Sequence, residues 1–267
     1  MPIGLDQIVR STRQRVAELR RNCDVGVLER KAEQHVPRGF RRALEAKGKT
    51  GPAIIAELKK ASPSRGLIRA DFDAASLAGE FELAGAAALS VLTDEKFFQG
   101  SLDNLARASA RTSLPCLRKD FIVDELQIVQ ARACGADAIL LIVAALSQQE
   151  LETLAESARR RELDVLCELH DEQELTRALD AGCSLIGVNS RDLRTFRVDL
   201  QTAYRLAEQL PSNALPVAES GIHNAADLVS LRAVGYQAFL IGESLMRAKF
   251  PAEALKTLLA ESLRTGR

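Results

Sequence analysis

The chain has 267 residues, 46% of them hydrophobic and 27% charged, with 36 Lys and Arg against 36 Asp and Glu. This balance gives no bulk electrostatic case for a nucleic-acid partner or an anionic membrane. No apolar run is long enough for a membrane span, and the N-terminus lacks the apolar stretch of a signal peptide, so we expect a soluble cytoplasmic protein. The five cysteines are scattered without zinc or redox spacing, and we expect them to be reduced.

Residues 1–50 precede the first strand pattern, and we expect them to form an N-terminal helical extension. Apolar residues at helical spacing predict a helix over residues 5–20, and a second helix is expected over residues 30–46. No linker or second core interrupts the chain, which predicts a single domain over residues 1–267.

After the extension, a short apolar run, a polar loop and an amphipathic stretch repeat along the chain. The runs are near-continuously apolar, as parallel strands covered on both faces tend to be, and their spacing is that of βα units. We expect strands at Ala53–Leu58, Ala87–Leu92, Pro115–Arg118, Ala138–Ile142, Val165–Glu168, Leu185–Val188, Pro216–Ala218 and Ala238–Ile241. We expect helices at Asp73–Leu83, Asp124–Cys134, Ser147–Arg160, Asp171–Ala181, Leu200–Leu210, Asn224–Val234 and Pro251–Leu263.

Eight strands alternating with helices fit either a doubly wound open sheet or a closed barrel. The open sheet favours a G-x-G-x-x-G turn after its first strand, and this sequence has none. The count and regularity therefore predict the α/β class, as one TIM-type (β/α)₈ barrel with an N-terminal helical extension.

Polar residues recur at the carboxyl ends of the predicted strands. Alternate residues of a barrel strand point inward, and active sites lie at the strands' carboxyl ends. Five strands bring such groups to that end: Glu57 and Lys59, Lys119, Glu168, Asn189 with Arg191 two residues later, and Glu219. Any one of them could mark a strand emerging into solvent, but five in register favour an acid–base constellation.

Small-residue loops follow the last two strands, a common place for phosphate in barrels. They read Glu219-Ser220-Gly221-Ile222 and Ile241-Gly242-Glu243-Ser244, and Ser62-Pro63-Ser64-Arg65-Gly66 is a third such loop after the first strand. Glycine lets the backbone approach an anion closely. The pattern predicts a phosphate site at the same end of the barrel.

The remaining polar residues suggest no metal site, since neither H-x₃-H nor H-E-x-x-H occurs. We expect His35 on the surface, and His170 and His223 at helix starts, where capping explains them. Asp137 and Asp164 precede strands and belong to the opposite, stability-related end of the barrel.

With these features the sequence resembles the indole-3-glycerol-phosphate synthases, lyases of the tryptophan pathway. The matching blocks, in the family's order, are residues 55–64 (IAELKKASPS), 117–121 (LRKDF), 186–193 (IGVNSRDL), 218–222 (AESGI) and 240–246 (LIGESLM). The resemblance runs from the N-terminal extension to the last helix. Leu58 differs from the family pattern, in which an aromatic residue or Val is frequent at this position. We expect Leu58 to face the helices, so the difference leaves the catalytic residues unaffected.

The resemblance implies closure of an indole ring. The substrate, 1-(2-carboxyphenylamino)-1-deoxyribulose 5-phosphate, loses CO₂ and water, with Lys119 as general acid and Glu168 as general base. Glu57 and Lys59 form a supporting pair. No metal or organic cofactor is implied, because the substrate's own carbonyl is the electron sink.

The resemblance also implies the binding roles. Asn189 and Glu219 orient the substrate, Arg191 is placed for the anthranilate carboxylate, Phe121 packs on the aromatic ring, and Ser62, Ser220, Gly221, Gly242 and Glu243 surround the phosphate, the last two through backbone N–H groups. The expected partner is this small phosphosugar–anthranilate molecule, bound by a monomer or weak homo-oligomer.

Two alternatives remain open. Phosphoribosylanthranilate isomerase and related phosphosugar isomerases share the barrel and phosphate site, but they use other acid and base residues and lack the block at residues 117–121. The second alternative is a non-catalytic phosphosugar-binding barrel, which would not require an acid and a base at Lys119 and Glu168.

Overall fold

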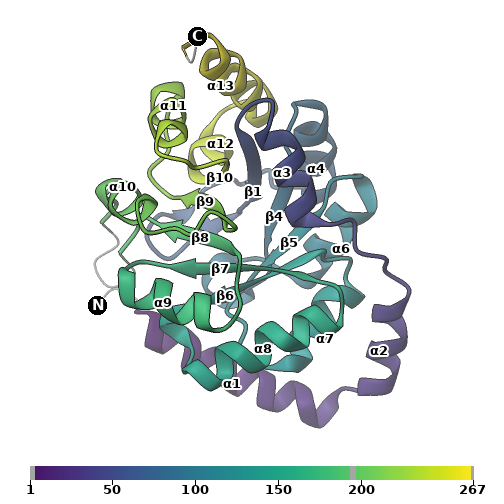
Figure 1. Ribbon diagram of the computed structural model, residues 1–267. Helices are drawn as coiled ribbons and strands as arrows, with labels where there is room; N and C mark the ends of the chain where they lie inside the picture. The colour runs from purple at the N-terminus through teal and green to yellow at the C-terminus, as the bar shows by residue number, and fades with distance from the viewer. Residues whose placement is uncertain (1–3, 193–196, 266–267) are drawn as a thin grey trace.

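The computed structural model describes residues 4–192 and 197–265 and contains a closed barrel of parallel strands (Figure 1). The last residue of the 186–193 block, Leu193, lies outside the described residues. The barrel strands are β1 (Ala53–Leu58), β4 (Ala88–Leu92), β5 (Cys116–Lys119), β6 (Ala138–Ile142), β7 (Asp164–Leu169), β8 (Leu185–Asn189), β9 (Leu215–Glu219) and β10 (Ala238–Ile241). Each pairs with its neighbours in sequence order, and β1 closes the ring by pairing with both β4 and β10. The predicted barrel is confirmed, with every strand boundary within one residue of the prediction.

Helices surround the barrel, in the alternation expected from the sequence (Figure 1). They are α4 (Ala74–Leu83), α6 (Leu102–Arg111), α7 (Glu125–Ala133), α8 (Gln148–Arg160), α9 (Glu172–Asp180), α10 (Gln201–Ala207), α11 (Ala225–Ala233) and α13 (Pro251–Thr265). Ser147 and Glu150 form the reciprocal capping box that their spacing indicates at the start of α8.

Several short elements and one helix were not predicted. They are the hairpin β2 (Ala61–Ser62) and β3 (Gly66–Leu67), α5 (Glu95–Phe98), α6, the 3₁₀ turn η1 (Val143–Ala145) and α12 (Glu243–Arg247). Single turns and two-residue strands are too short to show a period. Helix α6 buries Leu105 and Ala108 and was missed although its apolar residues recur at helical spacing.

The N-terminal extension folds as three helices, α1 (Leu5–Asn22), α2 (Val25–Glu33) and α3 (Phe40–Gly48). The single helix predicted over residues 30–46 is therefore wrong. Pro37 disfavours a helical conformation at the residue before it, and Gly39 has a positive φ of 81°, which breaks the helix between α2 and α3.

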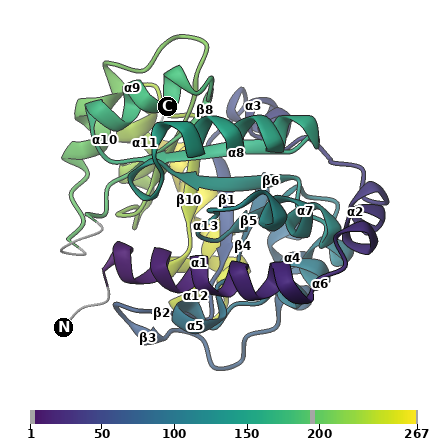
Figure 2. The same cartoon turned by 90° about the horizontal axis from the view of Figure 1, so that it is seen from below.

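The strands separate two apolar layers, as the predicted alternation requires. Ile54, Ala56 and Leu58 pack outward in the cluster under the helices, whereas Ile55 packs in a separate cluster inside the barrel. The interior cluster includes Phe40 and Leu44 of α3, both fully buried. Figure 2 shows α3 and α1 on opposite sides of the strands, with α1 beside β2, β3 and α5. Helix α3 thus plugs the amino end of the barrel and leaves the carboxyl end to α1.

Polar groups at the amino end serve the fold, as predicted for Asp137. The Asp137 carboxylate is fully buried and accepts hydrogen bonds from Arg38 Nε and Nη2 and from the backbone N–H of Cys116. His35, expected on the surface, instead places Nε2 3.2 Å from Asp137 Oδ1. Its position beside this carboxylate depends on the turn after α2, which the sequence did not reveal.

Two further findings concern the chain as a whole. All five cysteines are free. Among the described residues, no helix combines the length and apolar character that crossing a membrane requires.

Candidate active site

One pocket lies at the carboxyl end of the barrel, and every candidate site residue from the sequence lines it. These residues are Glu57, Lys59, Ser62, Lys119, Phe121, Glu168, Asn189, Arg191, Glu219, Ser220, Gly221, Gly242 and Glu243. They come from six strands and the loops that follow them. Glu57 and Glu243, 186 positions apart in the sequence, meet here because parallel barrel strands all end at the same rim.

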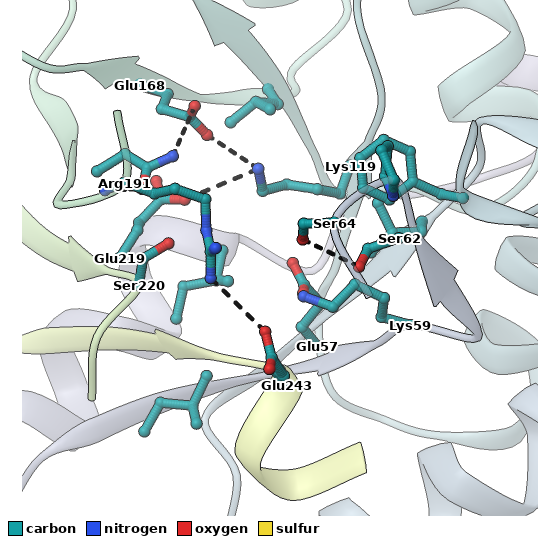
Figure 3. Close-up of a pocket in the computed structure, with 18 of the residues that line it drawn as sticks. Glu57, Lys59, Ser62, Ser64, Lys119, Glu168, Arg191, Glu219, Ser220 and Glu243 are labelled. Atoms are coloured by element: carbon teal, nitrogen blue, oxygen red, sulfur yellow. Dashed lines mark hydrogen bonds and ion pairs between the residues drawn. The ribbon is translucent and has the colours of Figure 1, made fainter. Parts of the chain in front are cut away.

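A buried charge cluster occupies the centre of the pocket (Figure 3). Lys119 Nζ lies 2.9 Å from Glu168 Oε2 and 3.8 Å from Glu219 Oε2. Asn189 Nδ2 donates to the other Glu168 oxygen at 3.1 Å. Both carboxylates are 2% exposed, so these contacts replace the water they would otherwise bind.

The cluster sets the protonation states of its members. Burial lowers the pKa of Lys119, but the surrounding carboxylates of Glu168, Glu219 and Glu57 outweigh burial and raise it, so the amine is charged. Burial raises the pKa of Glu168, but Lys119 and His170 outweigh that effect and lower it to about 2. This arrangement provides a proton donor and a charged proton acceptor in direct contact.

Glu219 differs from Glu168 although both face Lys119. Burial and the negative charge of Glu168 raise the pKa of Glu219 well above its usual range, and Lys119 offsets them only in part. Two neighbouring carboxylates with opposite pKa shifts are a common device for holding one as acid and one as base.

A second ion pair comes from the end of β1, where Lys59 Nζ donates to Glu57 Oε1. Two glycines, Gly187 on β8 and Gly242 directly after β10, leave space for the carboxylates. A Cβ at Gly242 would overlap the carboxylate of Glu57, and a Cβ at Gly187 would overlap Glu219 Oε1. Sequence reasoning assigned Gly242 to an anion and gave Gly187 no role.

The turn after β9 is unusual in its backbone. Ser220 and Gly221 both have positive φ angles, 64° and 81°. A non-glycine residue in this region is uncommon and marks a turn held by its surroundings. The strained turn carries the chain sharply away from Glu219 and places Ser220 at the pocket.

The Glu243 carboxylate is turned toward Arg191 across the pocket (Figure 3). Arg191 Nη2 lies 3.6 Å from Glu243 Oε2, and Arg65 Nε lies 2.9 Å from Glu243 Oε1. Arg191 is anchored by its backbone N–H, which donates to Asn189 Oδ1 at 3.0 Å. A carboxylate thus lies between two arginines where an anionic group of a ligand could also bind.

An apolar wall faces the charged cluster. Phe121 and Phe98 are ring neighbours with centroids 6.1 Å apart, and α1 adds Leu5 and Ile8. Leu5, Ile8 and Phe98 were not predicted, since their place in the pocket depends on how α1 and α5 cross the rim. A flat aromatic ligand matches such a wall.

A buried network supports the residue after Lys119. Asp120 Oδ2 accepts hydrogen bonds from Arg118 Nη2 at 2.8 Å and from Thr93 Oγ1 at 2.7 Å, and Arg15 Nη2 of α1 lies 3.3 Å from Asp120 Oδ1. Burial raises the pKa of Asp120, but the two arginines outweigh it and lower the pKa. The network ties α1 to the strand end that carries Lys119.

The described residues contain no group of three or more His, Cys, Asp and Glu side chains arranged to hold a metal ion. The pocket combines buried amines and carboxylates, one arginine and an aromatic wall. This set suits acid–base chemistry on an aromatic, anionic molecule.

Comparisons with known proteins agree with this geometry. A family model described as indole-3-glycerol phosphate synthase matches residues 5–258. A curated protein of that name from Koribacter versatilis is 58% identical over 97% of this chain and 100% of its own length. One from Polaromonas sp. is 47% identical over 95% of this chain and 97% of its own length.

Solved structures share the fold at low identity. KGPDC from Streptococcus mutans has a TM-score of 0.58 at 15% identity, covering 80% of this chain and 99% of that chain. The 3-hexulose-6-phosphate synthase from Salmonella typhimurium has a TM-score of 0.64 at 11% identity, covering 79% and 99%. At this identity the likeness supports the barrel alone.

Proposed function

The chain belongs to the indole-3-glycerol phosphate synthase family, and from that premise we propose how its pocket residues divide the reaction. The enzyme is a decarboxylating lyase of tryptophan biosynthesis. It closes the indole ring of 1-(2-carboxyphenylamino)-1-deoxy-D-ribulose 5-phosphate and releases CO₂ and water. The observation that carries the proposal is the buried contact between Lys119 and Glu168.

Lys119 is the general acid of ring closure. As the aryl carbon that bears the carboxylate attacks the ketone, negative charge develops on the ketone oxygen. The Lys119 ammonium is charged, buried and positioned at the pocket centre, so it can donate a proton to that oxygen. Loss of CO₂ then restores the benzene ring.

Glu168 is the general base of the final step. After decarboxylation, the ring carries a hydroxyl on one carbon and two hydrogens on the next, and loss of water makes it aromatic. The Glu168 carboxylate takes one of these hydrogens as a proton, while an acid assists the departing hydroxyl. Asn189 Nδ2 donates a hydrogen bond to Glu168 Oε1 and so orients the carboxylate.

Glu219 and the Glu57–Lys59 pair support these two residues. The raised pKa of Glu219 favours its protonated form, which can donate a hydrogen bond to a substrate oxygen. Lys59 is close enough to the central cluster, through Glu57, to assist proton transfer or contact the phosphate.

The binding roles follow the layout of the pocket. Arg191 takes the anthranilate carboxylate and Phe121 packs on the aromatic ring. The phosphate lies at the loops after β9 and β10, where Ser220, Gly221, Gly242 and Glu243 meet Ser62 from the loop after β1. We propose that a single domain, as a monomer or weak homo-oligomer in the cytoplasm, performs this reaction without a cofactor.

The division of roles can be tested by measuring CO₂ and indole product separately. Glu168→Gln should still release CO₂ in a single turnover but should form indole product slowly, by roughly 10²–10⁴-fold. Lys119→Met should slow both, because ring closure precedes both losses. Equal slowing of CO₂ and indole product in Glu168→Gln would contradict its placement in the final step.

A further inference from the structure

An imidazole lies against the proposed base and has no part in the reaction above. His170 directly follows β7, and its Nε2 lies 3.8 Å from Glu168 Oε1. Its Nδ1 lies 3.1 Å from Oε2 of Glu174 on α9. The capping role expected from the sequence belongs instead to Asp171, whose carboxylate accepts from the Glu174 backbone N–H.

Glu174 fixes this imidazole in place. The same oxygen, Glu174 Oε2, also accepts a hydrogen bond of 2.7 Å from the backbone N–H of His170. One carboxylate oxygen therefore holds both the main chain and the ring, and the ring can only present its other nitrogen toward Glu168. The His170 side chain is 16% exposed and that of Glu174 is 14% exposed, so both lie largely out of solvent.

The nitrogen that faces Glu168 is otherwise unsatisfied. His170 Nε2 is buried and has no hydrogen-bond partner in the described structure. Buried polar atoms are nearly always paired, so an unpaired nitrogen 3.8 Å from the charged Glu168 carboxylate indicates an electrostatic contact with that carboxylate.

Charges from three elements act on the ring. Burial lowers the pKa of His170, and Lys119 of β5 lowers it further. The hydrogen bond to Glu174 and the charges of Glu168 and Glu174 outweigh both and raise the pKa above its usual value. The charges around the ring therefore favour the imidazolium form over the neutral ring.

We propose that His170 is a positioning residue for Glu168, and that its imidazolium, held by Glu174, keeps the Glu168 carboxylate charged and aimed into the pocket. His170 lies behind the carboxylate and does not itself touch the substrate. The inference rests on the proposed role of Glu168 as general base.

The first test is a titration of the three histidine rings by NMR. Coupling between two groups is reciprocal, so any effect of His170 on Glu168 appears equally as an effect of Glu168 on the pKa of His170. Glu168→Gln and Glu174→Gln should each lower the pKa of His170, by about one unit or more. The NMR signals of His35, which lies beside Asp137 at the other end of the barrel, should be unaffected by both substitutions and serve as the internal control. An unchanged His170 titration in Glu168→Gln would overturn the proposal.

The second test separates positioning from a merely structural role. His170→Gln keeps a polar side chain but carries no charge at any pH. The kcat of His170→Gln relative to the wild type should be lowest at acidic pH, where the wild-type ring is charged, and should approach one as the pH rises and that ring loses its proton. The matched variant His35→Gln should keep the wild-type pH profile.

These tests distinguish a failure of the positioning role of His170 from a failure of the proposed role of Glu168. A loss in His170→Gln that is equal at every pH would overturn the positioning role, even if Glu168 is the base. Wild-type indole formation by Glu168→Gln would instead overturn the role of Glu168, whatever the NMR titration shows.

Discussion

Gly187 on β8 leaves the space that the carboxylate of Glu219 on β9 fills. A Cβ at Gly187 would overlap Glu219 Oε1 and lie 3.2 Å from the Leu166 side chain. Glu219 Oε1 is buried and has no hydrogen-bond partner in the described structure. A glycine in the middle of a buried strand therefore determines where a carboxylate of the neighbouring strand lies, and the absence of a side chain is a feature of the active site.

Gly187→Ala should lower kcat by about tenfold or more, because the methyl group displaces Glu219 from the central cluster. Gly51→Ala is the matched control, since its Cβ would make an ordinary 3.5 Å contact with Leu263. The double variant with Glu219→Ala tests the cause. Its kcat should equal that of Glu219→Ala alone, whereas additive losses would show that Gly187 acts elsewhere.

Lys119→Met should lose most of kcat, roughly 10²–10⁴-fold, while retaining substrate affinity and the fold. The ammonium donates to the ketone oxygen only as the ring closes, so its loss affects the transition state more than binding. Substrate binding and the far-UV circular dichroism spectrum should match those of the wild type. In the surface variant Lys256→Met, kcat, substrate binding and the spectrum should all match the wild type. A Lys119→Met enzyme within a few-fold of the wild type would remove Lys119 from this role.

The phosphate is best tested through the substrate. Gly242→Val should lose activity. Because Gly242 also leaves space for the Glu57 carboxylate, that loss alone does not show where the phosphate binds. The substrate without phosphate should lose kcat/KM by more than about 100-fold in the wild type, because remote binding energy positions the reacting ends.

Glu243→Ala should be tolerated, with kcat/KM within about tenfold of the wild type. Its carboxylate pairs with Arg65 and Arg191, and an anionic substrate competes with it for those arginines. The measurements are kcat/KM of Glu243→Ala with the normal substrate, and kcat/KM of the wild type with the substrate with and without phosphate. A crippled Glu243→Ala enzyme with normal use of the dephosphorylated substrate would place the phosphate elsewhere.

Asp137→Asn should destabilise the fold at pH 7 by about 3–5 kcal/mol, because it leaves the Arg38 guanidinium without its buried partner. Burial raises the pKa of Asp137, but hydrogen bonds from His35 and Arg38 outweigh it and lower the pKa. A lowered folded-state pKa stabilises the fold above the unfolded value of about 3.9, and that contribution is lost as pH falls through the folded pKa.

Urea unfolding at several pH values measures this effect. The difference between wild type and Asp137→Asn should be largest near pH 7 and shrink below about pH 4. Asp71→Asn is the control, since the Asp71 side chain is 78% exposed and its pair with Arg69 should contribute roughly 0–1 kcal/mol. A deficit that grows on acidification would contradict the sign of the Asp137 shift.

The barrel could be predicted because parallel strands covered on both faces are continuously apolar, and their polar residues appear where the strands end. From the sequence alone, that rule predicts the positions of Lys119, Glu168, Asn189 and Glu219 at the carboxyl end of the barrel. It also placed Ile55 inside the barrel and Leu58 under the helices, as the structure shows.

Other features depend on contacts between distant segments and leave no local pattern. His170 looks like a residue at a helix start until Glu168 and Glu174 are placed around it. Leu5 joins the pocket only because α1 crosses the rim. The direction of the Glu243 carboxylate depends on two arginines from separate loops, Arg65 and Arg191.

The central claim is tested most directly by supplying 1-(2-carboxyphenylamino)-1-deoxyribulose 5-phosphate to the purified wild-type protein and following indole fluorescence and CO₂ together. We predict a rise in indole fluorescence with one CO₂ released for each indole formed, without added metal or cofactor, and little of either with Lys119→Met. Folded wild-type protein that binds this substrate but releases neither product would contradict the account.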